Sequence, residues 1–175
     1  SKYDFPNYFN FRLYDDNDDG NGYVVHVLGR DSDSLWGAYT NEKLTEGNWY
    51  HIGWTIGSGA ESGKIFIDGH EATYSTTWTP DVNDRFNHGV DSYIGAQITT
   101  ANLHNGSIDE VAVWSRTLTD PEVVELYDSG KGVYINKDKD FSASGTSMGQ
   151  KLEGLWHFDD GVGSSIARDA SVNTN

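Results

Sequence analysis

The chain has 175 residues, of which 27 are acidic and 12 basic, so its formal net charge is −15. This charge excludes nucleic-acid-binding proteins, which neutralise the phosphate backbone with Lys and Arg. It also disfavours binding to an anionic membrane surface. Aromatic residues make up 13% of the chain, which argues against disorder, and the absence of Cys excludes disulfides, thiolate metal sites and cysteine nucleophiles.

The first 115 residues alternate short apolar runs with clusters of Gly, Asp, Asn and Ser, a pattern typical of strands joined by turns. Residues 8–14 and 23–28 predict a hairpin, and residues 64–67 predict a strand that ends in the tight turn Asp68-Gly69. Further strands are expected at 49–56, 92–96 and 107–114, with a long loop at 75–91. The tryptophans that we assign to the core are Trp49, Trp54, Trp114 and Trp156.

One helix is predicted at residues 119–128. Thr119 stands at its N-cap and Glu122 follows three residues later, which is the capping-box pattern. Pro121 lies in the first turn, where a missing N–H has no cost, and Gly130 is expected to end the helix.

Residues 131–150 are polar and rich in Ser and Gly, so they predict a linker or a surface loop. Strand character returns at residues 152–158, and the chain then ends in a polar segment.

These motifs, in this order, resemble the latter part of a laminin-G-like domain of the concanavalin A-like lectin/glucanase type, with a more distant similarity to pentraxins. The positions that match the family pattern are Gly47, Trp49, His51, Asp68, Gly69, Gly95, Gly106, Ile108, Asp109, Glu110, Val111, Leu118 and Glu122. The resemblance implies an all-β jelly-roll sandwich with one short helix after the last strand of this motif block.

The segment 152–175 resembles the opening of the same family, so the family ending comes first and the family opening last. We therefore expect a β-sandwich at 1–130, the linker at 131–150, and at 151–175 either the opening strand of a following repeat or a strand that closes a permuted domain. The favoured interpretation is a fragment of a tandem array. Exchange of this strand between neighbouring copies is a third interpretation.

A candidate Ca²⁺ site lies in the predicted hairpin turn. Asp15, Asn17 and Asp19 alternate before Gly20, like the first half of a calcium loop in which oxygen ligands converge on a hard cation. Position 12 of such a loop would be His26, not a bidentate Glu, and hairpin turns use the same residue types. A plain solvated turn is therefore the favoured interpretation.

Catalysis is not expected. Related hydrolases of this fold resemble the chain around Asp109 and Glu110 but carry two catalytic Glu residues on that strand, where paired carboxylates act as nucleophile and acid. Here those two positions are Ser107 and Ala112. The resemblance implies structural roles for Asp109 and Glu110.

Three aromatic residues in polar surroundings are candidate ligand-binding residues: Trp36, Tyr39 and Trp78. Aromatic faces flanked by Asn, Asp and His suit sugar rings, although large aromatics also pack over strand ends in any sandwich.

Together with the resemblance, these residues predict a non-catalytic extracellular module, on a cell or virion surface, that binds a glycan or a cell-surface partner. The main alternative is an architectural domain of a virion, envelope or filament, in contact with neighbouring copies or repeats. A glycoside-active enzyme is the third candidate.

Overall fold

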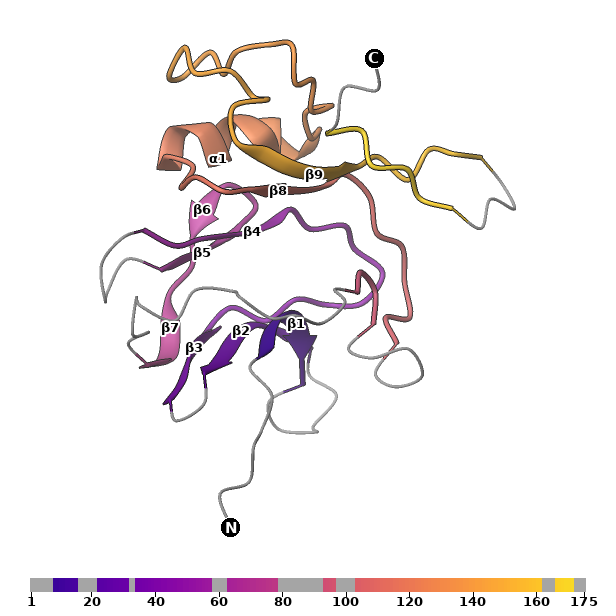
Figure 1. Ribbon diagram of the computed structural model, residues 1–175. Helices are drawn as coiled ribbons and strands as arrows, with labels where there is room; N and C mark the ends of the chain where they lie inside the picture. Colours follow the sequence, from indigo (N-terminus) through magenta and orange to yellow (C-terminus); the bar gives the residue numbers. More distant parts are fainter. Residues whose placement is uncertain are drawn as a thin grey trace. The chain divides into compact units, whose positions relative to one another are not determined.

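The computed structural model describes residues 8–15, 22–31, 34–57, 63–78, 93–96, 103–161 and 166–171. They fall into two compact units, Ser1–Tyr93 and Ile94–Asn175, which are described separately. The described strands pair in antiparallel sheets, and one short helix is present, as expected for a concanavalin A-like β-sandwich (Figure 1).

The first unit contains a four-stranded sheet in the order β1-β2-β3-β7. Its strands are β1 (Tyr8–Tyr14), β2 (Val24–Asp31), β3 (Ser34–Thr40) and β7 (Tyr74–Trp78). The pairing of β1 with β2 confirms the predicted hairpin. The expected loop at 75–91 was wrong over its first residues, because Ser75–Trp78 belong to β7. The remainder, 79–91, lies outside the described residues.

A three-stranded sheet, β4-β5-β6, completes this unit: β4 (Ile52–Thr55), β5 (Lys64–Ile67) and β6 (His70–Glu71). The turn after β5 is the predicted one, because Asp68 and Gly69 both have positive φ, 50° and 76°. The Asp68 carboxylate also accepts the His51 backbone N–H at 2.9 Å, which ties this turn to the approach of β4.

The core of the first unit lies between side chains of the two sheets. Val25 and Val27 of β2 cluster with Ile65 of β5, and Leu44 and Ala72 complete the buried set. The packing of Tyr50, Ile52 and Trp54 against this cluster confirms the predicted apolar face at 49–56. Trp49 was wrongly assigned to the core: its side chain is 68% exposed, because it is offset by one position from Tyr50, Ile52 and Trp54, which alternate toward the core.

The second unit contains the sheet β8-β9, formed by Val111–Trp114 and Leu152–Trp156. The strand predicted at 107–114 was too long, and the strand predicted at 92–96 was wrong. Residues 107–110 precede β8 without strand pairing, and Glu110 has a φ of 49°, outside the extended region. Residues 93–96 form no strand and include Gly95 at φ 76°.

The helix α1 spans Asp120–Tyr127 and is followed by a 3-10 turn, η1 (Asp128–Gly130). The predicted N-terminus is confirmed, since Glu122 reaches back to accept the Thr119 N–H at 2.8 Å. The helix ends earlier than expected: Asp128, not Gly130, takes the left-handed C-cap conformation, with a φ of 41°.

Residues 131–150 contribute three buried apolar side chains to this unit: Ile135, Phe141 and Met148. The segment is therefore packed, although its sequence has the composition of a linker. The domain boundaries expected from the sequence remain a prediction.

Candidate functional site

The two faces of the sheet β1-β2-β3-β7 carry different side chains. Register places Arg12 opposite His26, and His26 opposite Tyr39. Since residues directly opposite each other share a face, these three residues lie on one side, and Val25 and Val27 lie on the other, core side. We call the side that carries Arg12, Tyr14, His26 and Tyr39 the polar face.

A hydrogen bond between Arg12 and His26 determines which nitrogen of the His26 ring carries the proton. The Nε–H of Arg12 donates to Nδ1 of His26 at 3.2 Å. His26 is only 4% exposed, and burial, with the nearby Arg12 charge, lowers its pKa to about 4. The ring is therefore neutral at pH 7. Because Nδ1 accepts, the ring proton sits on Nε2.

Two tyrosines flank this histidine. Their ring centroids lie 5.6 Å (Tyr14) and 4.7 Å (Tyr39) from that of His26, in tilted arrangements. The Arg12 guanidinium lies 5.0 Å from the centre of the Tyr14 ring, a cation–π distance. Tyr14 is 40% exposed, so the cluster reaches the surface.

The Nε2 atom of His26 is buried and has no hydrogen-bond partner among the described residues. A buried donor without an acceptor costs about 1–3 kcal/mol. Such a group in a native fold calls for an explanation, and an absent ligand is one.

The predicted ligand-binding residues divide between the two faces. Trp78 is paired with Gly37, so its strand position belongs to the polar face together with Tyr39. Gly37 is required here because a Cβ would overlap the carbonyl oxygen of Val27. Trp36 is paired with Gly29, which places it by register on the core face with Ala38. The side chains of Trp36 and Trp78 lie outside the described residues.

The predicted calcium ligands are mostly outside the described residues too. Asp15 follows β1 directly, whereas Asn17 and Asp19 are not described. The described residues contain no group of three His, Asp or Glu side chains suited to a metal. Calcium binding at Asp15, Asn17 and Asp19 therefore stays a prediction.

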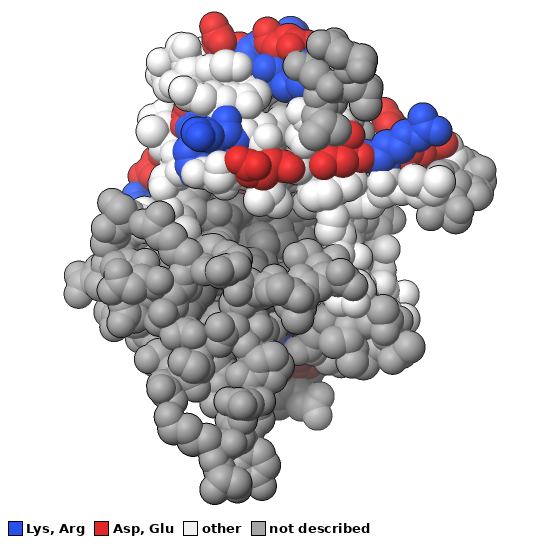
Figure 2. Space-filling model, in the orientation of Figure 1, with Lys and Arg blue, Asp and Glu red and all other residues white. Residues whose placement is uncertain are grey.

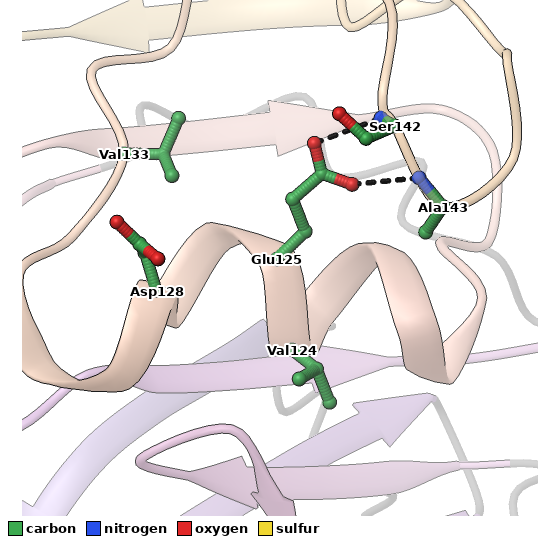
Figure 3. Close-up of a pocket in the computed structure, with 6 residues that line it drawn as sticks. All are labelled: Val124, Glu125, Asp128, Val133, Ser142 and Ala143. Atoms are coloured by element: carbon green, nitrogen blue, oxygen red, sulfur yellow. Dashed lines mark hydrogen bonds between the residues drawn. The ribbon is translucent and has the colours of Figure 1, made fainter.

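A second candidate site is a recess beside α1, shown in Figure 3 and lined by Val124, Glu125, Asp128, Val133, Ser142 and Ala143. Glu125 spans it, because its two carboxylate oxygens accept the backbone N–H groups of Ser142 and Ala143, both at 2.8 Å. These two hydrogen bonds, from Ser142 first, lower the pKa of Glu125. The carboxylate is thus already used to fix the 141–146 turn to the helix.

Asp109 and Glu110, for which the family resemblance implied structural roles, are engaged in internal contacts. Glu110 lies 2.7 Å from Nδ1 of His157 and accepts the Ile135 N–H at 3.5 Å, and the His157 ring is stacked on Tyr134. Asp109 accepts the N–H of Glu110. Both carboxylates hold local structure together.

Charge gives no further site on the face of the second unit that Figure 2 displays. In this view, Lys and Arg side chains lie next to Asp and Glu side chains over the second unit, and no patch of a single charge is visible. The polar face of the first unit is the stronger candidate, because it combines aromatic rings, a cation and a buried unpaired donor.

The sequence did not single out Arg12, Tyr14 or His26 as site residues. The signal was present in the predicted hairpin: alternate positions 10, 12 and 14 are polar or aromatic, opposite the face of Phe9, Phe11 and Leu13. Pairing this face with the partner strand would have led to His26.

Comparison with known proteins identifies the family. The model described as the concanavalin A-like lectin/glucanases superfamily, of the laminin G type, matches residues 3–124. The chain therefore belongs to the laminin G-like group of this superfamily, whose members are typically non-catalytic binding modules.

A search of curated proteins finds no match. Among solved structures, the chain is similar to an S-layer domain-containing protein (residues 221-444) from Clostridium thermocellum, at 22% identity and a TM-score of 0.37. The match covers 70% of this chain and 63% of that one, so less than two thirds of the solved chain is spanned. No helix among the described residues is long and apolar enough to cross a membrane.

Proposed function

We propose that the protein is a non-catalytic, extracellular recognition module that binds a glycan on the polar face. Family membership supports the general class, and one observation supports the location: by strand register, the positions of Tyr39 and Trp78 belong to the same face as His26, whose Nε2 is buried and unpaired. A sugar presents an apolar ring face and a polar rim. The tyrosine rings suit the first, and the Arg12 and His26 donors suit the second.

A glycan array tests this proposal. Wild-type protein is expected to bind a restricted set of glycans, and Trp78→Ala is expected to lose them. Trp49→Ala is the matched control, because Trp49 is 68% exposed and does not belong to the polar-face sheet. Equal losses in the two variants, or no bound glycan at all, would contradict the proposal.

The alternative, an architectural domain that contacts neighbouring copies, predicts a different result. Regular self-assembly in solution without any bound glycan would favour it. Calcium held by Asp15, Asn17 and Asp19 would be an addition to either function, and of these three residues the structure describes Asp15, which follows β1 directly.

A further inference from the structure

An Asn-Gly pair lies in the exposed segment that leads to β8. Asn105, Gly106 and the following Ser107 are all exposed and belong to no helix or strand. Among the described residues, neither the Asn105 side chain nor the Gly106 backbone N–H makes a hydrogen bond. Both groups therefore lack the interactions that usually hold an asparagine amide and a backbone amide in place.

Other described asparagines are in a different situation. Asn41 and Asn48 donate to threonine hydroxyls at 3.0 and 2.8 Å, and the side-chain oxygen of Asn136 accepts a backbone N–H at 2.9 Å. Each is followed by a residue with a side chain, whose Cβ hinders approach to the backbone nitrogen. Of the asparagines that the structure describes, Asn105 alone is followed by glycine.

The local packing favours glycine at position 106. A Cβ there would lie 2.7 Å from Nε2 of His104, so the imidazole would have to move. The His104 backbone is itself fixed, because its N–H donates to the carbonyl oxygen of Gly95 at 2.7 Å. The residue that hinders attack on the asparagine side chain least is thus the one that fits after Asn105.

We propose that Asn105 and Gly106 form a self-modification site, at which the asparagine converts to aspartate and isoaspartate. The backbone nitrogen of Gly106 attacks Cγ of Asn105 and closes a five-membered succinimide ring, a step that the proximity of the two groups favours. The Cγ–Nδ2 bond breaks, and ammonia leaves with the proton that the Gly106 nitrogen gives up.

Water is the co-reactant of the second step, in which the succinimide ring opens. Hydrolysis of the bond between the Gly106 nitrogen and Cγ gives aspartate. Hydrolysis of the bond between this nitrogen and the main-chain carbonyl carbon of Asn105 gives isoaspartate. The site is separate from the proposed glycan-binding face, because Asn105 belongs to the second unit.

The isoaspartate product changes the chain as well as its charge, because it adds one methylene group to the main chain. Residues on either side of the site contact Gly95: the His104 N–H donates to its carbonyl oxygen, and the Ile108 side chain lies beside its Cα. We expect the longer main chain to weaken the His104–Gly95 hydrogen bond. The aspartate product changes the charge without lengthening the chain.

Peptide-mapping mass spectrometry tests the site. The full chain and a synthetic peptide of residues 103–108 are incubated at neutral pH, and loss of ammonia followed by uptake of water is measured at Asn105. The rate in the folded protein is expected to be within about threefold of the peptide rate, since an exposed, unpaired segment opens at almost no free-energy cost. A rate more than about tenfold below that of the peptide would overturn the proposal, because the fold would then protect the site.

The same digests contain the internal controls. Asn41, Asn48 and Asn136 are expected to remain unmodified over the time in which Asn105 converts, and conversion at equal rates would overturn the selectivity that the structure assigns. Asn105→Gln should abolish the product, because its ring would need six members. Gly106→Ala should slow the reaction about tenfold in the protein and in the peptide, since the new Cβ hinders attack. An unchanged rate in the peptide, where folding plays no part, would overturn attack by this nitrogen.

Amide hydrogen exchange of His104 tests the structural consequence. Exchange is expected to be faster in the purified isoaspartate form than in the unmodified protein, and unchanged in Asn105→Asp, the matched control with the same charge and a main chain of normal length. Equal exchange in the three forms would overturn the expected weakening of the Gly95 contact and leave the modification itself standing.

Discussion

Arg12 donates its Nε–H to Nδ1 of His26 at 3.2 Å, a contact in which a permanent cation lies against a neutral imidazole. Protonation of His26 would place two positive charges side by side in a buried position. This relationship is expected to make the first unit sensitive to acid.

We expect the free energy of unfolding to fall as the pH drops from 6.5 to about 4. In this window the unfolded state binds a proton at His26 and the folded state does not, because burial and the Arg12 charge lower the folded-state pKa to about 4. The loss would be at most about 3 kcal/mol from this residue. Burial also lowers the pKa of His51, which acts in the same direction.

Urea denaturation of wild type and His26→Gln at several pH values measures this effect. The variant should show a flatter pH dependence between pH 6.5 and 4. An unchanged slope would mean that His26 is not the group responsible.

Glu122→Gln should destabilise the second unit by about 3 kcal/mol, because it removes one partner of a buried ion pair. The Glu122 side chain is 1% exposed, and its carboxylate accepts hydrogen bonds from Nη1 and Nη2 of Arg116 at 2.9 and 3.2 Å. Burial alone would raise the pKa of Glu122, but hydrogen bonds from Arg116, Ser144 and the Thr119 N–H outweigh it and hold the pKa at about 2. The stabilisation is therefore complete above pH 4.5 and is lost as the pH falls through 2.

Thermal and urea unfolding compare this variant with Asp138→Asn. Asp138 also pairs with a cation, Lys137, but its side chain is 77% exposed, so its removal should change stability by less than about 1 kcal/mol. Similar effects of the two substitutions would contradict the importance of burial.

Leu155→Ala tests how the C-terminal strand is used. Leu155 of β9 is 1% exposed and pairs with Ala112 of β8 in the same chain. If β9 closes this unit, the substitution should cost about 2–5 kcal/mol, since a large buried side chain is removed.

The control is Leu103→Ala in the same unit, because Leu103 is 65% exposed. If Leu155→Ala leaves stability as unchanged as the control does, residues 151–175 behave as the free opening strand of a following repeat.

Calcium binding is checked by isothermal titration calorimetry of wild type and of the double variant Asp15→Ala/Asp19→Ala. If the alternating oxygen ligands at 15, 17 and 19 hold the ion, wild type should bind one Ca²⁺ more than the variant. Unchanged stoichiometry would exclude the site and leave the segment as a solvated turn.

The sequence predicted those elements whose signals are local. The hairpin 8–28, the Asp68-Gly69 turn and the Thr119–Glu122 helix start each depend on residues close together in the chain, and all three are confirmed. The strand β3 was not predicted, because its Gly and Ser residues resemble a loop. Its pairing with both β2 and β7 compensates for that low strand propensity.

Long-range contacts account for the rest. Residues 131–150 have the composition of a linker, yet Phe141 is fully buried and the Glu125 carboxylate fixes the turn beside it. In the site, Tyr39 and Trp78 were predicted individually, but their common face required the register of β3 with β7. His26 gained its role only through contact with Arg12, fourteen residues earlier.

The most direct test of the central claim is an amide chemical-shift map recorded while the best array glycan is added to the ¹⁵N-labelled protein. We predict that the perturbed amides concentrate in β1, β2, β3 and β7, around Arg12, His26 and Tyr39. Perturbations confined to the α1 recess, around Val124, Asp128 and Ala143, would contradict a binding site on the polar face.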